Sequence, residues 1–173
     1  LNVAGNLMNN DSSKLVLTAN KWGQASVVFG NDNEHQNPKA TVEMFVPQGN
    51  GSNTDPIWQY RGIIVDGFAK GNGPWECMAI YYWDEATNND LNQGCWHSVT
   101  NGGNPAAINL SPWTGYAFAN ICRGQDTAAT WLTYTGTLIR EDQNIGLSYH
   151  YNEYEERKPF ANVGINLITN SYS

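Results

Sequence analysis

The chain has 173 residues, of which 40% are hydrophobic and only 14% are charged, and its formal net charge at pH 7 is −7. This length suits one domain with a single core, and the charged fraction lies well below the ~25% that is usual for soluble domains. The nine Lys and Arg residues are scattered. Because nucleic acids and anionic lipid surfaces need grouped positive charge, both are excluded as expected partners. We therefore expect a single domain over residues 1–173 with a neutral polar surface.

Short alternating segments follow one another along the chain, separated by turns rich in Gly, Asn and Pro. In chain order, the expected strands cover residues 1–8, 14–19, 25–29, 40–46, 57–70, 77–83, 95–97, 115–122, 133–139, 144–151 and 161–169. Asp126 followed by small residues predicts one or two helical turns before Trp131. The pattern predicts an all-β fold, a compact antiparallel β-sandwich of about ten to twelve strands with at most one or two short helices.

Alternation within the expected strands assigns side chains to a core. The strand over 40–46 places Val42, Met44 and Val46 on one face. Aromatic residues in the middle of strands usually pack inside, so Phe45, Phe118 and Trp131 are also expected in the core.

Residues 74–99 hold the densest group of aromatic residues in a chain with seven Trp and nine Tyr. An apolar strand runs into three consecutive aromatic residues, a polar loop follows over 84–94, and a short strand then carries Cys95, Trp96 and His97. Tyr and Trp combine an apolar body with a polar tip, which suits a binding surface. The expected ligand-binding residues are Tyr81, Tyr82, Trp83, Asp84, Asn92, Trp96, His97, Trp113 and Tyr116.

Strand alternation divides the three consecutive aromatic residues between the two faces of the expected strand. Tyr81 and Trp83 share one face of the expected strand, and Tyr82 lies on the other. Only part of the segment is therefore expected to bind a ligand, unless the strand ends at these residues.

Signatures of catalysis are mostly missing. The sequence holds no Gly-rich phosphate loop, no nucleophile elbow and no paired His at helical spacing. Cys95 and His97 share a strand face, but no third orienting group is visible nearby, so packing is the favoured interpretation. Asp84 or Glu85 with a second acid would suit a glycan-active jelly-roll enzyme only at a carboxyl separation that sequence does not give. We expect no enzyme, no catalytic residue, no metal site and no cofactor.

Three cysteines cannot all pair within one chain. Cys77 and Cys95 flank the polar loop and would pair across adjacent strands, whereas buried reduced cysteines are an equally good interpretation. The redox compartment stays open at this point.

Several motifs together resemble the actinoporins, the membrane-binding toxins of sea anemones, and related proteins of other organisms. The matching runs are 25–34, 71–73, 77–83, 84–93, 95–99, 109–113 and 144–168. The resemblance implies a compact β-sandwich that recognises sphingomyelin-type head groups and, in the anemone toxins, forms pores.

The chain departs from the toxins at three places. Residues 1–22 carry no apolar helical stripe that would insert into a membrane. Ala107 and Ile108 stand where the toxins have tyrosines, and Arg61-Gly62 continues to Ile63 without the Arg-Gly-Asp motif. Non-lytic lipid-binding proteins and fungal fruit-body lectins therefore become the better analogues.

The expected function is non-enzymatic recognition of a membrane sphingolipid head group, with or without cholesterol, through loop aromatics and without pore formation. A soluble protein, secreted or cytosolic, acting at cell-membrane surfaces would do this. The alternatives are a carbohydrate-binding lectin of the same fold and a glycan-active jelly-roll enzyme.

Overall fold

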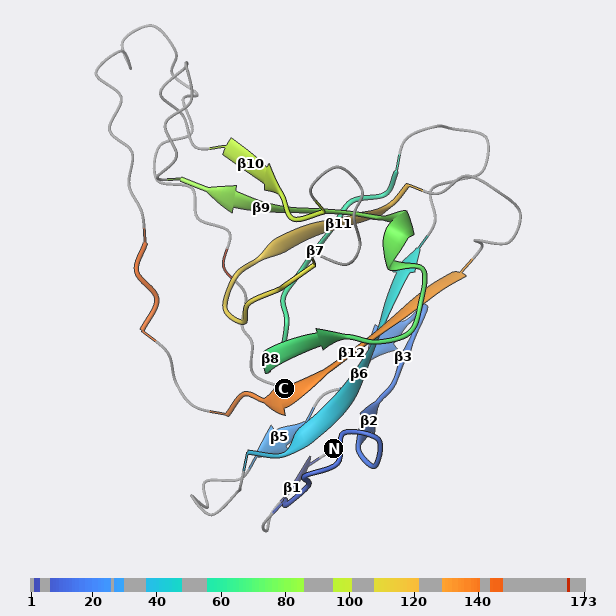
Figure 1. The fold of residues 1–173 in the computed structure, drawn as a ribbon, viewed down its shortest axis with the longest axis vertical. Helices are drawn as coiled ribbons and strands as arrows, with labels where there is room; N and C mark the ends of the chain where they lie inside the picture. Colours follow the sequence, from blue (N-terminus) through green and yellow to red (C-terminus); the bar gives the residue numbers. More distant parts are fainter. Residues whose placement is uncertain are drawn as a thin grey trace, which may run out of the picture.

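The computed structural model describes residues 2–3, 7–25, 27–29, 37–47, 56–85, 95–100, 108–121, 129–140, 144–147 and 168 (Figure 1). Within these ranges the elements are β1 (Asn2–Val3), β2 (Val16–Leu17), β3 (Ala19–Asn20), β4 (Gly23–Gln24), β5 (Val28–Phe29), β6 (Lys39–Pro47), β7 (Gln59–Arg61), β8 (Val65–Lys70), the 3-10 helix η1 (Trp75–Cys77), β9 (Met78–Asp84), β10 (Cys95–Ser98), β11 (Tyr116–Asn120) and β12 (Ala129–Leu138). The predicted all-β fold class is confirmed.

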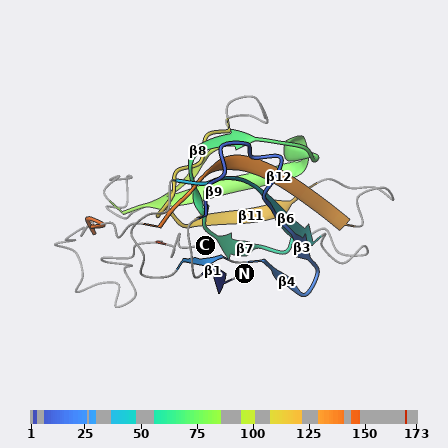
Figure 2. The same ribbon diagram turned by 90° about the horizontal axis from the view of Figure 1, so that it is seen from below.

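Two four-stranded sheets form the body of the fold, and Figure 1 shows them as two layers. One has the order β10-β9-β11-β7 and the other β2-β6-β12-β8. Two-stranded pairs, β1-β5 and β3-β4, complete the described strands, and Figure 2 shows the β3-β4 hairpin beside β6. The pairings are antiparallel except β1 with β5 and β2 with β6, which are parallel.

The core lies between the two large sheets. β6 alternates strictly, and its Ala40, Val42, Met44 and Val46 are buried. Buried side chains of β6 and β12 form one cluster with those of β9 and β11, including Ile80 and Phe118. Each fully buried aliphatic or aromatic side chain of this kind stabilises the fold by roughly 1.5–3 kcal/mol. This shared cluster is what holds the two sheets face to face.

Tyr134 contributes the largest polar side chain of the β12 inner face. It is 1% exposed, and burial raises the pKa of its phenol to about 12. Hydrogen bonds to the Ile64 backbone and the Gln24 side chain satisfy the hydroxyl. The polar tip is therefore paired inside the sandwich, as buried phenols require.

Only one of the three aromatic residues predicted in the core is fully buried. Phe118 is fully buried, as expected, but Trp131 is 44% exposed and does not belong to the core. Leu132 and Tyr134 take the inner face of β12, so alternation turns Trp131 outward. There its ring packs on the half-buried Phe45 at 5.0 Å, and its Nε1 donates to the Ala19 carbonyl at 3.0 Å.

Element boundaries also differ from the prediction. The run expected as one strand over 57–70 is split: β7 belongs to one large sheet and β8 to the other, and buried Ile63 lies between them. β12 begins at Ala129, and the rest of the segment from Asp126, where one or two helical turns are predicted, lies outside the described residues. Residues 144–147 are not in a strand, and the rest of the predicted strands over 144–151 and 161–169 lies outside the described residues, apart from a single bridge at Ile168.

The β8–β12 pairing contains a bulge. Its register shifts between Thr135 and Thr137, and Gly67 on β8 has a φ of 64°. Gly136 lies between the two registers, where a Cβ atom would come 2.5 Å from the Asp66 carbonyl oxygen. Only a glycine permits the two backbones to approach this closely.

Cys77 forms a disulfide bond. Cys95 is not placed to be its partner, since Cys95 pairs with Asp84 in the β9–β10 ladder, seven residues beyond Cys77. Seven extended residues span about 23 Å, whereas disulfide-bonded Cα atoms lie within about 7 Å. The Cys77–Cys95 pairing is thus excluded by the register. The remaining cysteine, Cys122, lies outside the described residues.

Peptide mapping of the unreduced protein should therefore find Cys77 linked to a cysteine other than Cys95. Mass spectrometry of a chymotryptic digest with and without reductant makes the assignment, because aromatic residues separate the three cysteines whereas residues 71–122 contain no Lys or Arg for trypsin to cut. A Cys77–Cys95 peptide would contradict the β9–β10 register.

Gly136→Ala should destabilise the fold by about 1–3 kcal/mol, because the added methyl forces β8 and β12 apart. Gly23→Ala is the matched control, since a Cβ there meets nothing within 4 Å, and we expect a change within about 0.5 kcal/mol. Urea unfolding of both variants measures the difference. Equal stability of the two would show that the close contact is absent in solution.

Candidate functional site

Strand pairing decides which of the predicted site residues share a face. In the sheet β10-β9-β11-β7, Trp96 lies opposite Trp83, and Ala117 lies opposite Tyr81. Since directly opposite residues project to the same side of a sheet, these four side chains occupy one face. We call this the outer face, because the other side of the sheet packs against the core.

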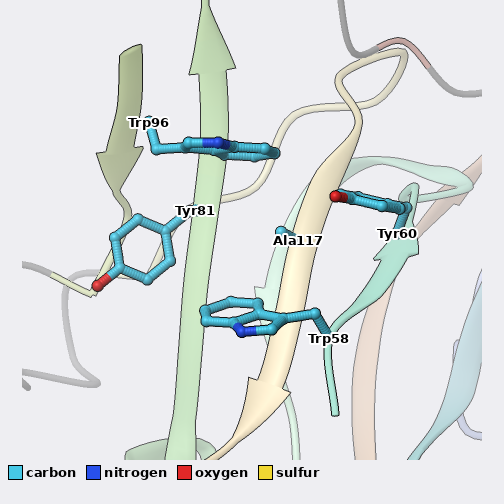
Figure 3. A pocket seen from close by; sticks show the side chains of 5 residues that line it. All are labelled: Trp58, Tyr60, Tyr81, Trp96 and Ala117. Atoms are coloured by element: carbon cyan, nitrogen blue, oxygen red, sulfur yellow. The ribbon is translucent and has the colours of Figure 1, made fainter. Parts of the chain in front are cut away.

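Five residues of the outer face line a pocket of about 330 Å³, which we call the aromatic pocket: Trp58, Tyr60, Tyr81, Trp96 and Ala117 (Figure 3). Trp58 immediately precedes β7, which carries Tyr60. The remaining three come from β9, β10 and β11. All four strands of the sheet therefore contribute to one pocket.

Figure 3 shows the four rings arranged around Ala117. Trp58 and Tyr81 meet edge-on, with centroids 5.7 Å apart and planes at 67°. Tyr60 and Trp96 are nearly parallel, at 17°, with centroids 6.3 Å apart. The small side chain of Ala117, only 5% exposed, leaves the space that the rings surround.

The pocket opens to solvent through three of its rings. Trp58 is 46%, Tyr60 67% and Trp96 42% exposed. Large aromatic side chains usually bury most of their surface in a monomeric domain, so a group of exposed rings on one face makes this pocket the candidate binding site.

Trp83 does not line the pocket, but it lies on the same face and supports the ring of Trp96. Its ring meets that of Trp96 edge-on at 5.5 Å, and its Nε1 donates to Glu85 Oε2 at 2.9 Å. Glu85 is 2% exposed, so its carboxylate is buried within the fold. Trp83 thereby fixes the orientation of Trp96, and Glu85 in turn fixes Trp83.

Four predicted site residues lie on the opposite, inner face of the same sheet: Tyr82, Asp84, His97 and Tyr116. Tyr82 stacks on His97 at 5.3 Å and 22°, and His97 Nε2 lies 3.8 Å from Asp84 Oδ2. Tyr82 and Tyr116 pack on the core, whereas His97 and Asp84 each keep about a third of their side-chain surface exposed, and none of the four lines the aromatic pocket.

Tyr116 belongs to the core cluster. Its hydroxyl accepts a hydrogen bond from the Ser111 backbone N–H at 2.8 Å. Burial raises the pKa of this phenol, an effect that hydrogen bonds with Ser111 and Thr114 partly offset. Tyr116 thus ties β11 to the preceding turn.

The last two predicted residues are placed elsewhere. Trp113 lines a separate cavity and has a φ of 66°. Asn92 lies outside the described residues. The structure therefore brings Tyr81, Trp83 and Trp96 together and separates them from the other predicted residues.

Sequence reasoning did not select Trp58, Tyr60 or Ala117. A signal was present for the first two, because two aromatic residues two positions apart in an extended segment share a face. Nothing in the sequence, however, states that β7 pairs with β11 and so comes near Tyr81.

The chemistry available at the aromatic pocket is that of rings, indole N–H groups and phenol hydroxyls. Neither Asp84 nor Glu85 lines it. Within the described ranges, no three His, Cys, Asp or Glu side chains gather as a metal site needs. No helix in those ranges is long and apolar enough to cross a membrane.

Comparisons of the chain with protein-family models, with curated proteins and with solved structures give no match. The likeness to actinoporins therefore stays a prediction from the sequence motifs.

Proposed function

We propose that the protein is a non-enzymatic binding module whose aromatic pocket takes the quaternary ammonium of a choline lipid head group, as in sphingomyelin. The observation that carries the proposal is the convergence of four aromatic rings from three strands and the residue before β7 around one small floor residue, Ala117.

Cation–π attraction supplies the binding energy. A quaternary ammonium within about 6 Å of an aromatic face gains roughly 0.5–2 kcal/mol, and Trp is the strongest partner. A pocket with two Trp and two Tyr offers several such faces to one cation. The methyl groups of choline also fit an apolar lining, because they carry no hydrogen-bond donors that would need partners.

The same lining disfavours a sugar as the ligand of this pocket. Sugar hydroxyls must exchange water for protein donors and acceptors, or their burial costs free energy. The described lining residues include no amide, carboxylate or guanidinium group, and the only polar atoms on their side chains are indole N–H groups and phenol hydroxyls. A quaternary ammonium carries no hydroxyl group, so its burial in the pocket leaves no hydrogen-bonding group of the ligand unpaired.

The surroundings of the pocket suit a membrane interface. Trp58, Tyr60 and Trp96 all project from the outer face with large exposed fractions. Trp and Tyr favour the head-group region of bilayers, where one end of the ring is apolar and the other is hydrated. Because the chain has no basic cluster, a zwitterionic head group is a better match than an anionic one.

Vesicles of phosphatidylethanolamine that contain sphingomyelin should bind the protein, whereas matched vesicles with ceramide in its place should not. Soluble phosphocholine should displace the bound protein, because it supplies the quaternary ammonium without the bilayer. Co-sedimentation measures both effects. Equal binding to the two vesicles, or binding that phosphocholine leaves unchanged, would refute choline recognition.

Trp96→Ala and Tyr82→Ala form a matched pair, since the two side chains lie on opposite faces of neighbouring strands. Trp96→Ala should weaken vesicle binding at least about tenfold, which corresponds to ~1.4 kcal/mol, with little loss of stability. Tyr82→Ala should lower the free energy of unfolding by about 2 kcal/mol, because it removes an aromatic side chain packed on the core. Its folded fraction should keep the wild-type affinity.

Co-sedimentation and urea unfolding of both variants make this comparison. The reverse pattern, with binding lost in Tyr82→Ala and kept in Trp96→Ala, would move the site to the inner face.

A further inference from the structure

A second cavity, of about 500 Å³, shares no lining residue with the aromatic pocket. It lies at the end of the sheet where β6 and β8 begin and β12 ends, beside the turn that precedes β11. Its polar and aromatic lining residues are Asn37, Asp66, Ser111, Trp113, Thr137 and Arg140. We call it the polar cavity.

Backbone irregularities on two sides shape the polar cavity. The bulge in the β8–β12 pairing, with Gly67 at a φ of 64°, follows Asp66 directly. Gly136 brings β12 close against the Asp66 backbone. Bulges are common beside functional sites, and here the residue that directly precedes the bulge, Asp66, places a carboxylate in the cavity wall.

Trp113 provides the other side. Its φ of 66° lies in the left-handed region, which costs a non-glycine residue roughly 1–2 kcal/mol. Such conformations persist where the surrounding structure enforces them, and they concentrate at functional sites. A bulky Trp is an unusual choice where Gly or Asn would adopt the same φ without strain.

The hydrogen-bonding groups of the polar cavity are only partly used within the fold. Asp66 Oδ1 accepts from the Gly67 N–H at 2.8 Å, and no cation of the described residues lies within ion-pair distance of this carboxylate. Arg140 Nε meets Asn37 Oδ1 at 3.4 Å, a long hydrogen bond, and no described carboxylate pairs with its guanidinium.

We propose that the polar cavity is a binding site for a neutral carbohydrate. A carboxylate, an amide and a guanidinium supply both acceptors and donors, which sugar hydroxyls need because each one donates and accepts. The Trp113 ring supplies an aromatic surface against which the CH face of a sugar packs. An anionic ligand would meet Asp66 and a cationic ligand would meet Arg140, so a neutral polyhydroxylated ligand fits both charges.

This proposal does not depend on choline recognition, and one set of variants separates the two. The full chain is tested on an array of neutral and acidic oligosaccharides built from glucose, galactose, mannose, N-acetylglucosamine and sialic acid. Binding of the strongest neutral glycan is then measured by calorimetry. Asp66→Asn and Arg140→Gln should each weaken it at least tenfold and leave binding to sphingomyelin vesicles unchanged. Trp58→Ala should leave glycan affinity unchanged.

Trp113 offers a second readout that separates recognition from folding. Trp113→Gly and Trp113→Ala both remove the ring, and both should lose glycan binding. Only glycine relieves the left-handed backbone, so Trp113→Gly should melt at the higher temperature of the two.

Three results would overturn the proposal. The first is an array without any neutral glycan bound. The second is glycan affinity that Asp66→Asn and Arg140→Gln leave unchanged. The third is glycan binding lost in Trp58→Ala, which would place the sugar in the aromatic pocket and would count against choline recognition as well.

Discussion

The aromatic pocket depends on the register of β9, which pairs on both edges. β10 lies along one edge and β11 along the other, and every residue from Met78 to Asp84 has a partner in at least one of these ladders. Because side chains alternate, a slip of one residue would exchange the two faces of the strand. It would expose Ile80 and drive Tyr81 into the core. The cost of exposing a buried apolar strand face therefore enforces the geometry of the pocket.

The outer face combines large rings with small residues in a specific order. The two central strands carry small side chains on the outer face: Ala117 and Ala119 on β11 and Ala79 on β9. Rings from the neighbouring strands surround Ala117, which is why a pocket forms on this face of the sheet (Figure 3). A larger residue at position 117 would fill the space between the rings. The pocket therefore depends on the small side chains of β11 as well as on the rings of the neighbouring strands.

The alternation of side chains predicts burial correctly wherever the sequence of a single strand determines which face is buried. The burial of Val42, Met44 and Val46 follows from alternation alone, and so does the separation of Tyr81 from Tyr82. Prediction fails where a second strand decides. The error at Trp131 has another cause. Trp131 shares its strand face with three threonines, whereas Leu132, Tyr134 and Leu138 lie on the other face, so alternation within β12 already turns it outward, against the general preference of mid-strand aromatic residues for the core.

The same limit explains the incomplete prediction of the site. Trp58 and Tyr60 reach Tyr81 only because β11 lies between β7 and β9. The periodicity of a strand does not show which distant segment the strand pairs with. Tyr116 is the opposite case. It lies near the predicted aromatic segment in space, but the alternation of side chains along β11 places its ring in the core.

The two cavities differ in chemistry because they arise from different parts of the fold. A sheet face presents side chains of one parity only, and at the aromatic pocket these are rings whose polar atoms are indole N–H groups and phenol hydroxyls. The end of a sheet has no such restriction, since bulges and turns bring side chains of either parity together. Asp66, Arg140 and Trp113 meet there through a bulge, a strand end and a strained turn. A regular surface therefore favours a ligand bound by its apolar and cationic character, and an irregular one favours a ligand that demands many directed hydrogen bonds.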